Sequence, residues 1–374
     1  MKHLPPRRGL SLLTTLILTP LVASAAAEPP PPKPNIVFLF ADDLGWGDLR
    51  FYGHPYAQTP HLDKLAAEGT RFTQCYATGV TCCPSRTGFM TSQFPARFAK
   101  YPADADFGDR VTITALLKQQ GYATGHFGKW HIGPDPSAGT YGIDAIGADP
   151  EEPGGGRKAS ATERGRDAHL YDETVRFIES HKDQPFFVNV WNHIPHAPVN
   201  PSQTLLDAFG PLQVDESKFP PQMRETFARC KSAGGDVSEH LRAYLAEIRS
   251  IDAEIGRLLQ RLDELGLREK TIVVFSSDQG PADILTPGTG PSEKAVAKKQ
   301  QKRKNQGKPP LIATDESNPA TNIRLNAMGH SGPFRGGKHP DLVKRLSVRL
   351  EAWKATLPTA YAKTASSDAE NELQ

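Results

Sequence analysis

The sequence contains little cysteine, almost no net charge and no internal repeat. Four cysteines among 374 residues are too few to build a disulfide scaffold. The 44 basic and 42 acidic side chains leave a net charge of +2, which gives no reason to propose nucleic acid as a partner. Hydrophobic residues make up 38% and charged residues 23%, which excludes wholesale disorder. A chain of this length is expected to form about two or three domains.

Long apolar runs are also scarce, and the one at residues 10–22 has the pattern of an export signal. A basic segment precedes it, and cleavage motifs of the Ala-x-Ala kind follow at residues 23–27. Because the run is shorter than the ~20 residues that a bilayer span needs, we predict a removable signal peptide over residues 1–27 and no stable membrane span. A proline-rich lead-in over residues 28–34 follows. The mature protein is expected to be secreted or periplasmic, by Sec or twin-arginine export.

Strand-like and helix-like stretches alternate along the rest of the chain. Residues 35–41 are a continuous apolar run, typical of a strand buried on both faces. Between Leu241 and Leu265, apolar residues recur every three or four positions, the signature of a helix with one apolar face. Further strands are predicted over residues 71–77, 122–127, 186–191 and 271–277, and further helices over residues 61–68, 113–120 and 168–181. The alternation predicts an α/β fold with a mostly parallel central sheet flanked by helices.

Acidic residues directly follow two of these strands. Asp42 and Asp43 follow the first strand, and Asp278 and Gln279 follow residues 271–277. Because ligands gather beyond the carboxyl ends of parallel strands, these side chains are expected to lie close together. An isolated Asp-Asp pair is more often a solvated turn, but three carboxylates and an amide oxygen suit Ca²⁺ or Mg²⁺. Zinc fits less well, because cysteines are scarce and no paired-histidine spacing occurs.

A second candidate group is the Cys-Cys-Pro-Ser-Arg segment at residues 82–86. Pro84 suits the first turn of a helix, which would place Cys82 near the positive end of the helix dipole. A thiol there is expected to have a lowered pKa and to be reactive. From these residues alone, Cys82 is equally a candidate nucleophile, a buried structural cysteine, or one partner of a disulfide with Cys75 or Cys230.

Six short blocks in a fixed order make the chain resemble the sulfatase family. The blocks are Asn35-Ile36-Val37 running into Ala41-Asp42-Asp43, Cys82-x-Pro84-Ser85-Arg86 followed by Thr91, Gly128-Lys129-Trp130-His131, Pro195-His196-Ala197-Pro198, Ser277-Asp278-Gln279-Gly280 and Gly336-Gly337-Lys338. One such block would be weak evidence, whereas six in order make coincidence implausible. The resemblance extends over residues 34–338.

The resemblance implies an alkaline-phosphatase-like fold and an arylsulfatase-type hydrolase that splits sulfate esters into an alcohol and inorganic sulfate. In that family a formylglycine-generating enzyme oxidises a cysteine to an aldehyde, formylglycine, and the match assigns this modification to Cys82. The hydrated aldehyde carries two hydroxyls. One attacks sulfur and forms a formylglycine-sulfate intermediate, and the other then expels sulfate. The implied substrate is a sulfated small molecule or glycan.

The same match assigns the metal ligands. Asp42, Asp43, Asp278 and Gln279 would hold Ca²⁺, or alternatively Mg²⁺, with the side chain derived from Cys82 facing the ion. The cation would polarise a sulfate oxygen and help to activate the diol.

The match also assigns the residues around the sulfate group. Arg86 would neutralise the anionic form of the diol, and Lys129 and Lys338 would bind sulfate oxygens. His131 would help to deprotonate the diol, while His196 and Lys338 would stabilise or protonate the leaving oxygen. His126, His193 and His330 are further candidates for the pocket wall.

The chain departs from the family pattern at three places. Gln279 replaces a frequent asparagine, and Ser92 replaces the glycine that usually follows the signature threonine. The catalytic domain, expected over residues 35–338, runs at once into a short helical and polar tail over residues 339–374, so the C-terminal subdomain is expected to be truncated.

Two alternatives to a sulfatase remain open from the sequence. One is a phosphodiesterase or phosphonate hydrolase that uses the same formylglycine machinery on phosphorus. The other is a truncated, non-catalytic relative that binds sulfated glycans.

Overall fold

A computed structural model describes seven segments of the chain: residues 32–79, 81–98, 106–134, 136–147, 163–282, 284 and 323–332. The expected signal peptide over residues 1–27, Lys338 and the tail over residues 339–374 lie outside the described residues.

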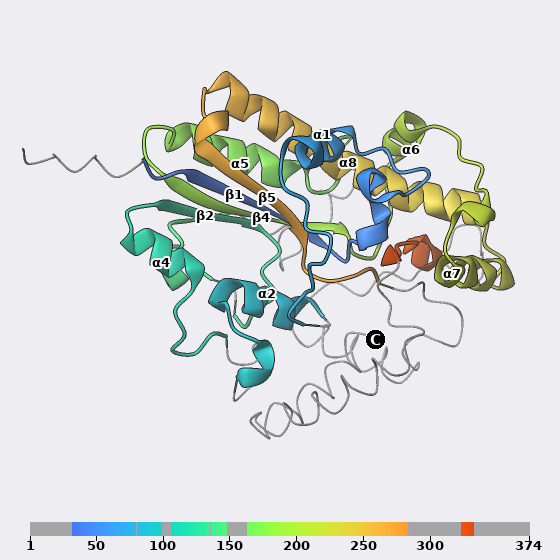
Figure 1. Cartoon of the computed structure of the whole chain (residues 1–374), viewed down its shortest axis with the longest axis horizontal. Coiled ribbons are helices and arrows are strands. Elements are labelled where there is room, and N and C mark those ends of the chain that lie inside the picture. The colour runs from blue at the N-terminus through green and yellow to red at the C-terminus, as the bar shows by residue number, and fades with distance from the viewer. Residues whose placement is uncertain are drawn as a thin grey trace, which may run out of the picture. The chain divides into compact units, whose positions relative to one another are not determined.

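A five-stranded sheet forms the centre of the fold (Figure 1). The strands are β1 Asn35–Asp42, β2 Ala123–Gly128, β3 Ala145–Ile146, β4 Phe186–Pro195 and β5 Thr271–Ser277. All of the pairings are parallel and the spatial order is β3-β2-β4-β1-β5. The expected α/β class and mostly parallel sheet are therefore confirmed, as are four of the five predicted strands.

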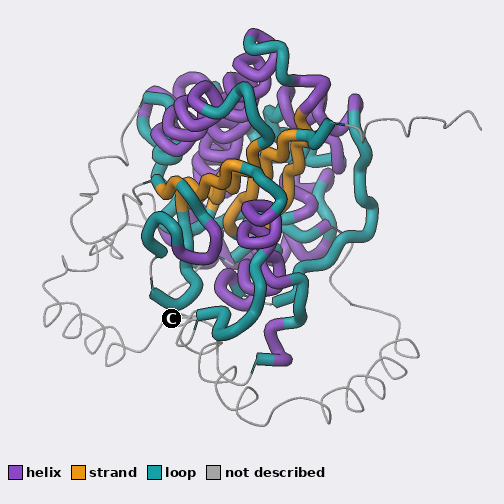
Figure 2. Tube along the Cα trace, turned by 90° about the vertical axis from the view of Figure 1, so that its left-hand side faces the viewer, coloured by secondary structure: helices purple, strands orange, loops and turns teal. Residues whose placement is uncertain are grey.

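Helices cover both faces of this sheet (Figure 2). They are α1 Pro60–Glu68, α2 Cys82–Thr91, α4 Ile113–Gln119, α5 Ala168–Ser180, α6 Gln203–Phe209, α7 Pro221–Ser232 and α8 Val237–Glu264. The four predicted helices correspond to α1, α4, α5 and α8. In the described part of the chain, no helix is long and apolar enough to cross a membrane.

Strand β1 contributes to two apolar cores because successive side chains point to opposite faces of the sheet. Val37 and Leu39 belong to the larger core, which includes the apolar faces of α5 and α8. Phe40 belongs to the smaller core, together with Met90 of α2 and Trp191 of β4. Burial of each apolar side chain of this size contributes about 1.5–3 kcal/mol to the free energy of folding. Burial on both faces fixes the end of β1, where Asp42 lies.

The predicted strand over residues 71–77 is wrong. The segment forms bends and irregular backbone that lead into α2, and it pairs with no strand of the described sheet. Phe72 and Tyr76 are each 68% exposed. A strand needs a neighbour for its backbone groups and usually a buried face, and this segment has neither.

Candidate active site

The candidate site lies at the carboxyl end of the sheet, where four strands and one helix deliver its side chains. Asp42 ends β1, and Asp278 follows β5, its backbone N–H donating to the carbonyl of Ala41 at 3.0 Å. Lys129 follows β2 and His196 follows β4, while Cys82 begins α2. The parallel topology therefore brings together residues that are as much as 236 positions apart, as the sequence predicted.

Three buried carboxylates form the acidic part of the site. Asp42, Asp43 and Asp278 each offer an oxygen, and these oxygens lie within 4.8 Å of one another. Burial and the neighbouring Asp42 carboxylate raise the pKa of Asp43, and the same causes raise that of Asp278 to about 7. Three carboxylates this close repel one another, so the cluster favours a bound cation.

Gln279 supports the same interpretation. Its Nε2 donates to Oδ1 of Asp43 at 2.5 Å, while its Oε1 is buried and has no hydrogen-bond partner among the described residues. Rotation of the amide by half a turn would direct a carbonyl oxygen toward the carboxylates, and the longer side chain relative to asparagine does not prevent this contact. All-oxygen sets of this kind suit Ca²⁺ and Mg²⁺, so the residues present fit the cation that the sequence implied.

Arg86 is a fully buried cation beneath the acidic cluster. Its Nε and Nη2 each lie 2.9 Å from Oδ2 of Asp278, and Nη2 lies 3.4 Å from Oδ1 of Asp42. The guanidinium also lies 4.9 Å from the ring centroid of Trp191, where the aromatic face stabilises its charge. These fixed contacts hold Asp42 and Asp278 in place.

Lys129 connects the carboxylates to the cysteine. Its Nζ donates to Oδ2 of Asp42 at 2.7 Å and to Sγ of Cys82 at 3.3 Å. Burial opposes ionisation of Asp42, but Lys129, His196 and Arg86 together hold the pKa of its carboxyl well below the usual range. Asp42 is therefore the member of the cluster whose charged form its neighbours favour.

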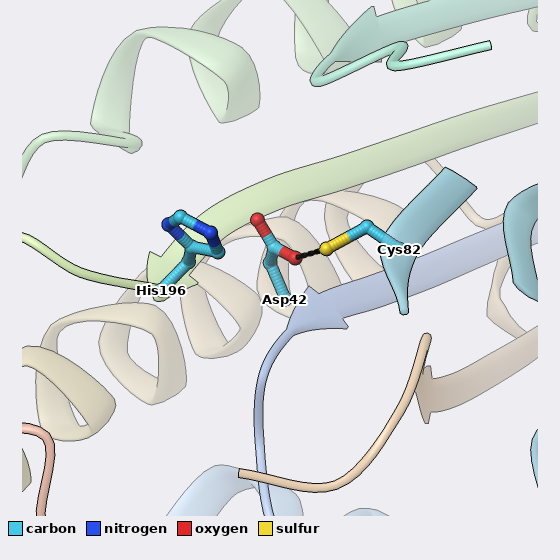
Figure 3. Close-up of side chains that lie close together, drawn as sticks. All are labelled: Asp42, Cys82 and His196. Carbon is cyan, nitrogen blue, oxygen red and sulfur yellow. Dashed lines mark hydrogen bonds between the residues drawn. The ribbon is translucent and has the colours of Figure 1, made fainter. Parts of the chain in front are cut away.

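Cys82 points at this cluster from the first position of α2. Figure 3 shows Asp42 between Cys82 and His196, and the thiol donates to Oδ1 of Asp42 at 3.2 Å. The expectation of a lowered pKa is wrong: burial, and then the Asp42 carboxylate, raise the pKa of the Cys82 thiol. Burial and the nearby carboxylates together outweigh the opposing effect of the Lys129 cation. A simple thiolate nucleophile is therefore not what this environment stabilises.

The disulfide alternative is also wrong. All four cysteines lie in the described residues, and none of them forms a disulfide. Of the adjacent pair, Cys82 is the one whose sulfur contacts Asp42, Lys129 and Gln279.

The two catalytic histidines expected from the sequence lie beside the cluster. Nε2 of His196 lies 3.8 Å from Oδ2 of Asp43, and the side chain is 42% exposed, so it can meet a substrate. His131 is within electrostatic range of Lys129, Arg86 and Asp42.

The other histidine candidates have different surroundings. His193 lies 3.0 Å from Asp167, His126 packs edge-on against Trp130 and Trp191, and His330 lines a small cavity beside α7. Of these three, His330 is therefore the one placed beside this cavity.

Comparison with known proteins agrees with the geometry. A family model described as Sulfatase matches residues 34–322. The chain belongs to the sulfatase family. It is 28% identical to N-acetylgalactosamine-6-O-sulfatase of Bacteroides thetaiotaomicron over 332 residues, covering 67% of this chain and 59% of the relative. It is 29% identical to human arylsulfatase A over 294 residues, covering 66% of this chain and 52% of the human protein.

A solved structure supports the fold of this chain. The chain matches the structure of BT4656, solved in complex with D-glucosamine-2-N,6-O-disulfate, with a TM-score of 0.53 and 20% identity, covering 81% of this chain and 82% of that one. At that identity the likeness shows the fold alone. The chain spans between about half and three fifths of the length of the first curated relatives that it matches.

One departure from the sulfatase pattern has a visible structural consequence. Ser92 ends α2 in the left-handed conformation, with a φ of 54°. That conformation costs a residue with a Cβ about 1–2 kcal/mol, whereas glycine adopts it freely. The replacement of the usual glycine therefore strains the far end of the helix that carries Cys82.

The sequence did not predict the residues that support His196. Arg166 and Asp167, just before α5, and Glu247 of α8 contact the end of β4 and the turn after it. Nothing in the sequence indicated which distant side chains hold this part of the chain.

Proposed function

We propose that this protein hydrolyses sulfate esters to an alcohol and inorganic sulfate, through a sulfated formylglycine made from Cys82 and with the help of a divalent cation. The observation that carries the proposal is the position of the Cys82 sulfur. It contacts both Asp42 of the acidic cluster and Lys129, and Lys129 in turn contacts Asp42. A formylglycine-generating enzyme would supply the aldehyde.

Asp42, Asp43, Asp278 and Gln279 are the residues that would hold the cation, with Ca²⁺ proposed first and Mg²⁺ as the alternative. When bound, the cation would supply Lewis-acid polarisation of a sulfate oxygen.

The chain's own residues supply charge and protons. Lys129, held by Asp42, is positioned to bind an anionic sulfate oxygen beside residue 82. Arg86 keeps Asp42 and Asp278 in place and adds positive charge below the site. His196 is exposed and close to Asp43, so we assign it to protonation of the leaving oxygen. His131 is assigned to removal of a proton during sulfate release, and Lys338, outside the described residues, to a second contact with sulfate.

A sulfated small molecule or glycan is the proposed substrate. The names of the relatives support this class, since one is an N-acetylgalactosamine-6-O-sulfatase. We also propose that the chain is exported, on the strength of its first 27 residues alone.

A side-by-side rate comparison tests the reaction. The protein, produced together with a formylglycine-generating enzyme, is assayed on an aryl sulfate and on an aryl phosphate diester. We expect a larger kcat/KM on the sulfate. A larger value on the phosphate diester would instead support the phosphodiesterase alternative, and tight binding of sulfated glycan without turnover would support the non-catalytic one.

A further inference from the structure

The end of β4 and the turn after it, which carries His196, are held mainly by side chains from other elements. Between residues 193 and 200, seven backbone groups bond to distant side chains: the N–H groups of His193, Ile194 and Asn200, and the carbonyls of His193, His196, Pro198 and Val199. These seven bonds leave the segment little freedom to move.

Arg166 makes the largest number of these contacts. Its guanidinium donates to the carbonyls of His193 at 2.9 Å, Pro198 at 3.3 Å and His196. On the opposite side its Nε forms a 3.3 Å ion pair with Glu247, whose side chain is 4% exposed. The planar fork of arginine can reach several carbonyls at once, which the single ammonium group of lysine cannot.

Two buried carboxylates complete the support. Asp167 accepts the N–H groups of His193 at 2.8 Å and Ile194 at 3.0 Å. Glu247 accepts the N–H of Asn200 at 3.0 Å while it pairs with Arg166. We call Arg166, Asp167 and Glu247 the turn brace.

The brace has a direct consequence for the imidazole of His196. Nδ1 of this ring lies 2.6 Å from the carbonyl oxygen of Ala197, so Nδ1 carries the proton and donates it. In the neutral ring, Nε2 is then the unprotonated nitrogen, and it faces Asp43 at 3.8 Å. The carbonyls on either side of Ala197, those of His196 and Pro198, are both held by Arg166.

We propose that Arg166 is a positioning residue for catalysis: by holding the carbonyls on both sides of Ala197, it fixes the tautomer and direction of the His196 ring. This inference rests on the proposed function, in which the doubly protonated His196 ring gives its Nε2 proton to the leaving oxygen and becomes neutral, while Nδ1 keeps the proton that it donates to Ala197. An arginine that acts through His196 matters most when the leaving group needs that proton.

The kinetic test compares two substrates and two variants. Arg166→Lys keeps a cation beside Glu247 but loses the fork. The matched control is Arg164→Lys, because Arg164 likewise pairs with a buried glutamate of α8, Glu254, but makes no described contact with the turn. One substrate is a nitroaryl sulfate, whose leaving group needs no proton, and the other is a sugar 6-sulfate, whose leaving group does.

We expect Arg166→Lys to lower kcat on the sugar sulfate by about 10- to 100-fold, as small misplacements of catalytic groups do, with little change in KM. On the nitroaryl sulfate kcat should change by no more than about twofold, and Arg164→Lys should leave the ratio of the two rates unchanged. An equal loss on both substrates would mean that Arg166 has a merely structural role, and would overturn the inference.

A second measurement decides the inference whether or not the chain turns over a sulfate ester. The imidazole ¹⁵N chemical shifts of His196, assigned by comparison with His196→Gln, report which ring nitrogen carries the proton. We expect the Nδ1-protonated form in the wild type and in Arg164→Lys, and a mixture of tautomers in Arg166→Lys. The same single tautomer in all three proteins would contradict the proposal. A wild type that releases no sulfate would count against the proposed function instead.

Discussion

Two groups of buried charged side chains lie near the same end of the sheet. They differ in how fully hydrogen-bond donors and cations surround their carboxylates. In the turn brace, Asp167 and Glu247 each accept backbone N–H groups and each have a positively charged or hydrogen-bonding partner. In the acidic cluster, one backbone N–H, that of Asp43, donates to Asp278, and the carboxylates mainly face one another and two cations.

One carboxyl from each group, Asp167 and Asp278, shows a difference in pKa. Glu247 and Asp42 shift in the opposite sense, because burial raises the pKa of Glu247, whereas Lys129, His196 and Arg86 hold that of Asp42 low against burial. Burial alone would raise the pKa of Asp167, yet its bonds to His193 and the neighbouring Arg166 hold that pKa below the usual value. Asp278, in the acidic cluster, has its pKa raised to about 7 by burial and Asp42. Both side chains are buried, so the difference comes from their neighbours: hydrogen-bond donors and Arg166 beside Asp167, and the charge of Asp42 beside Asp278. A satisfied buried carboxylate builds structure, whereas an under-satisfied cluster indicates a site for a ligand.

The largest expected effect is on Cys82, which faces the under-satisfied cluster. Cys82→Ala should lower turnover of an aryl sulfate by about three orders of magnitude or more, because the nucleophile itself is lost. Cys83→Ala is the matched control and should retain turnover within about tenfold. Steady-state rates on the two purified variants check this, and full activity of Cys82→Ala would refute the mechanism.

Next in size is the loss of a metal ligand. Loss of a residue in the outer shell of a metal site weakens metal binding by about 10- to 100-fold. Asp278→Asn changes a direct ligand and should therefore weaken Ca²⁺ binding by more than that. It should also cut turnover severely and increase sensitivity to chelators. The metal-free variant should lose no more than about 1 kcal/mol of unfolding free energy, because relief of repulsion with Asp42 offsets the weaker bond to Arg86. Titration calorimetry and urea unfolding measure the two quantities, and unchanged Ca²⁺ affinity would argue against the assignment.

The equivalent aspartate-to-asparagine substitution in the turn brace should lower stability but leave Ca²⁺ binding nearly unchanged. Asp167→Asn should lower the unfolding free energy by about 1–3 kcal/mol, because charge-assisted bonds to two backbone N–H groups and to His193 are weakened. Its Ca²⁺ affinity should stay within about twofold of wild type. A variant that loses metal affinity but not stability would break the distinction between the two groups.

The smallest effect is expected at the far end of α2. Ser92→Gly should raise the unfolding free energy by about 1 kcal/mol by relieving the left-handed conformation at a φ of 54°. Turnover should not change, since Ser92 lies at the opposite end of the helix from Cys82. Urea unfolding of the two proteins checks it; a loss of stability would mean that the serine makes a compensating contact.

The sequence was sufficient where one local pattern decides the outcome. The continuous apolar run before Asp42 predicted β1, and the apolar repeat from Leu241 predicted most of α8, which begins four residues earlier at Val237. The carboxylates at the ends of β1 and β5 could be brought together by topology alone, because parallel strands end at the same edge.

The sequence failed where distant contacts decide. Residues 71–77 contain strand-forming types, but whether a neighbouring strand is present is a property of the whole fold. The pKa of Cys82 is raised by burial and then by Asp42, 40 positions away, and neither can be predicted from the residues next to Cys82 in the sequence. The brace joins Arg166 to Glu247 across 81 positions, and no periodicity or motif indicates such a pair.

Mass spectrometry of the peptide that contains Cys82, taken from catalytically active protein, tests the central claim most directly. We predict an aldehyde in place of the thiol at residue 82 and an unchanged thiol at Cys83. An unmodified Cys82 in protein that still releases sulfate, or an aldehyde at Cys83 instead, would contradict the account.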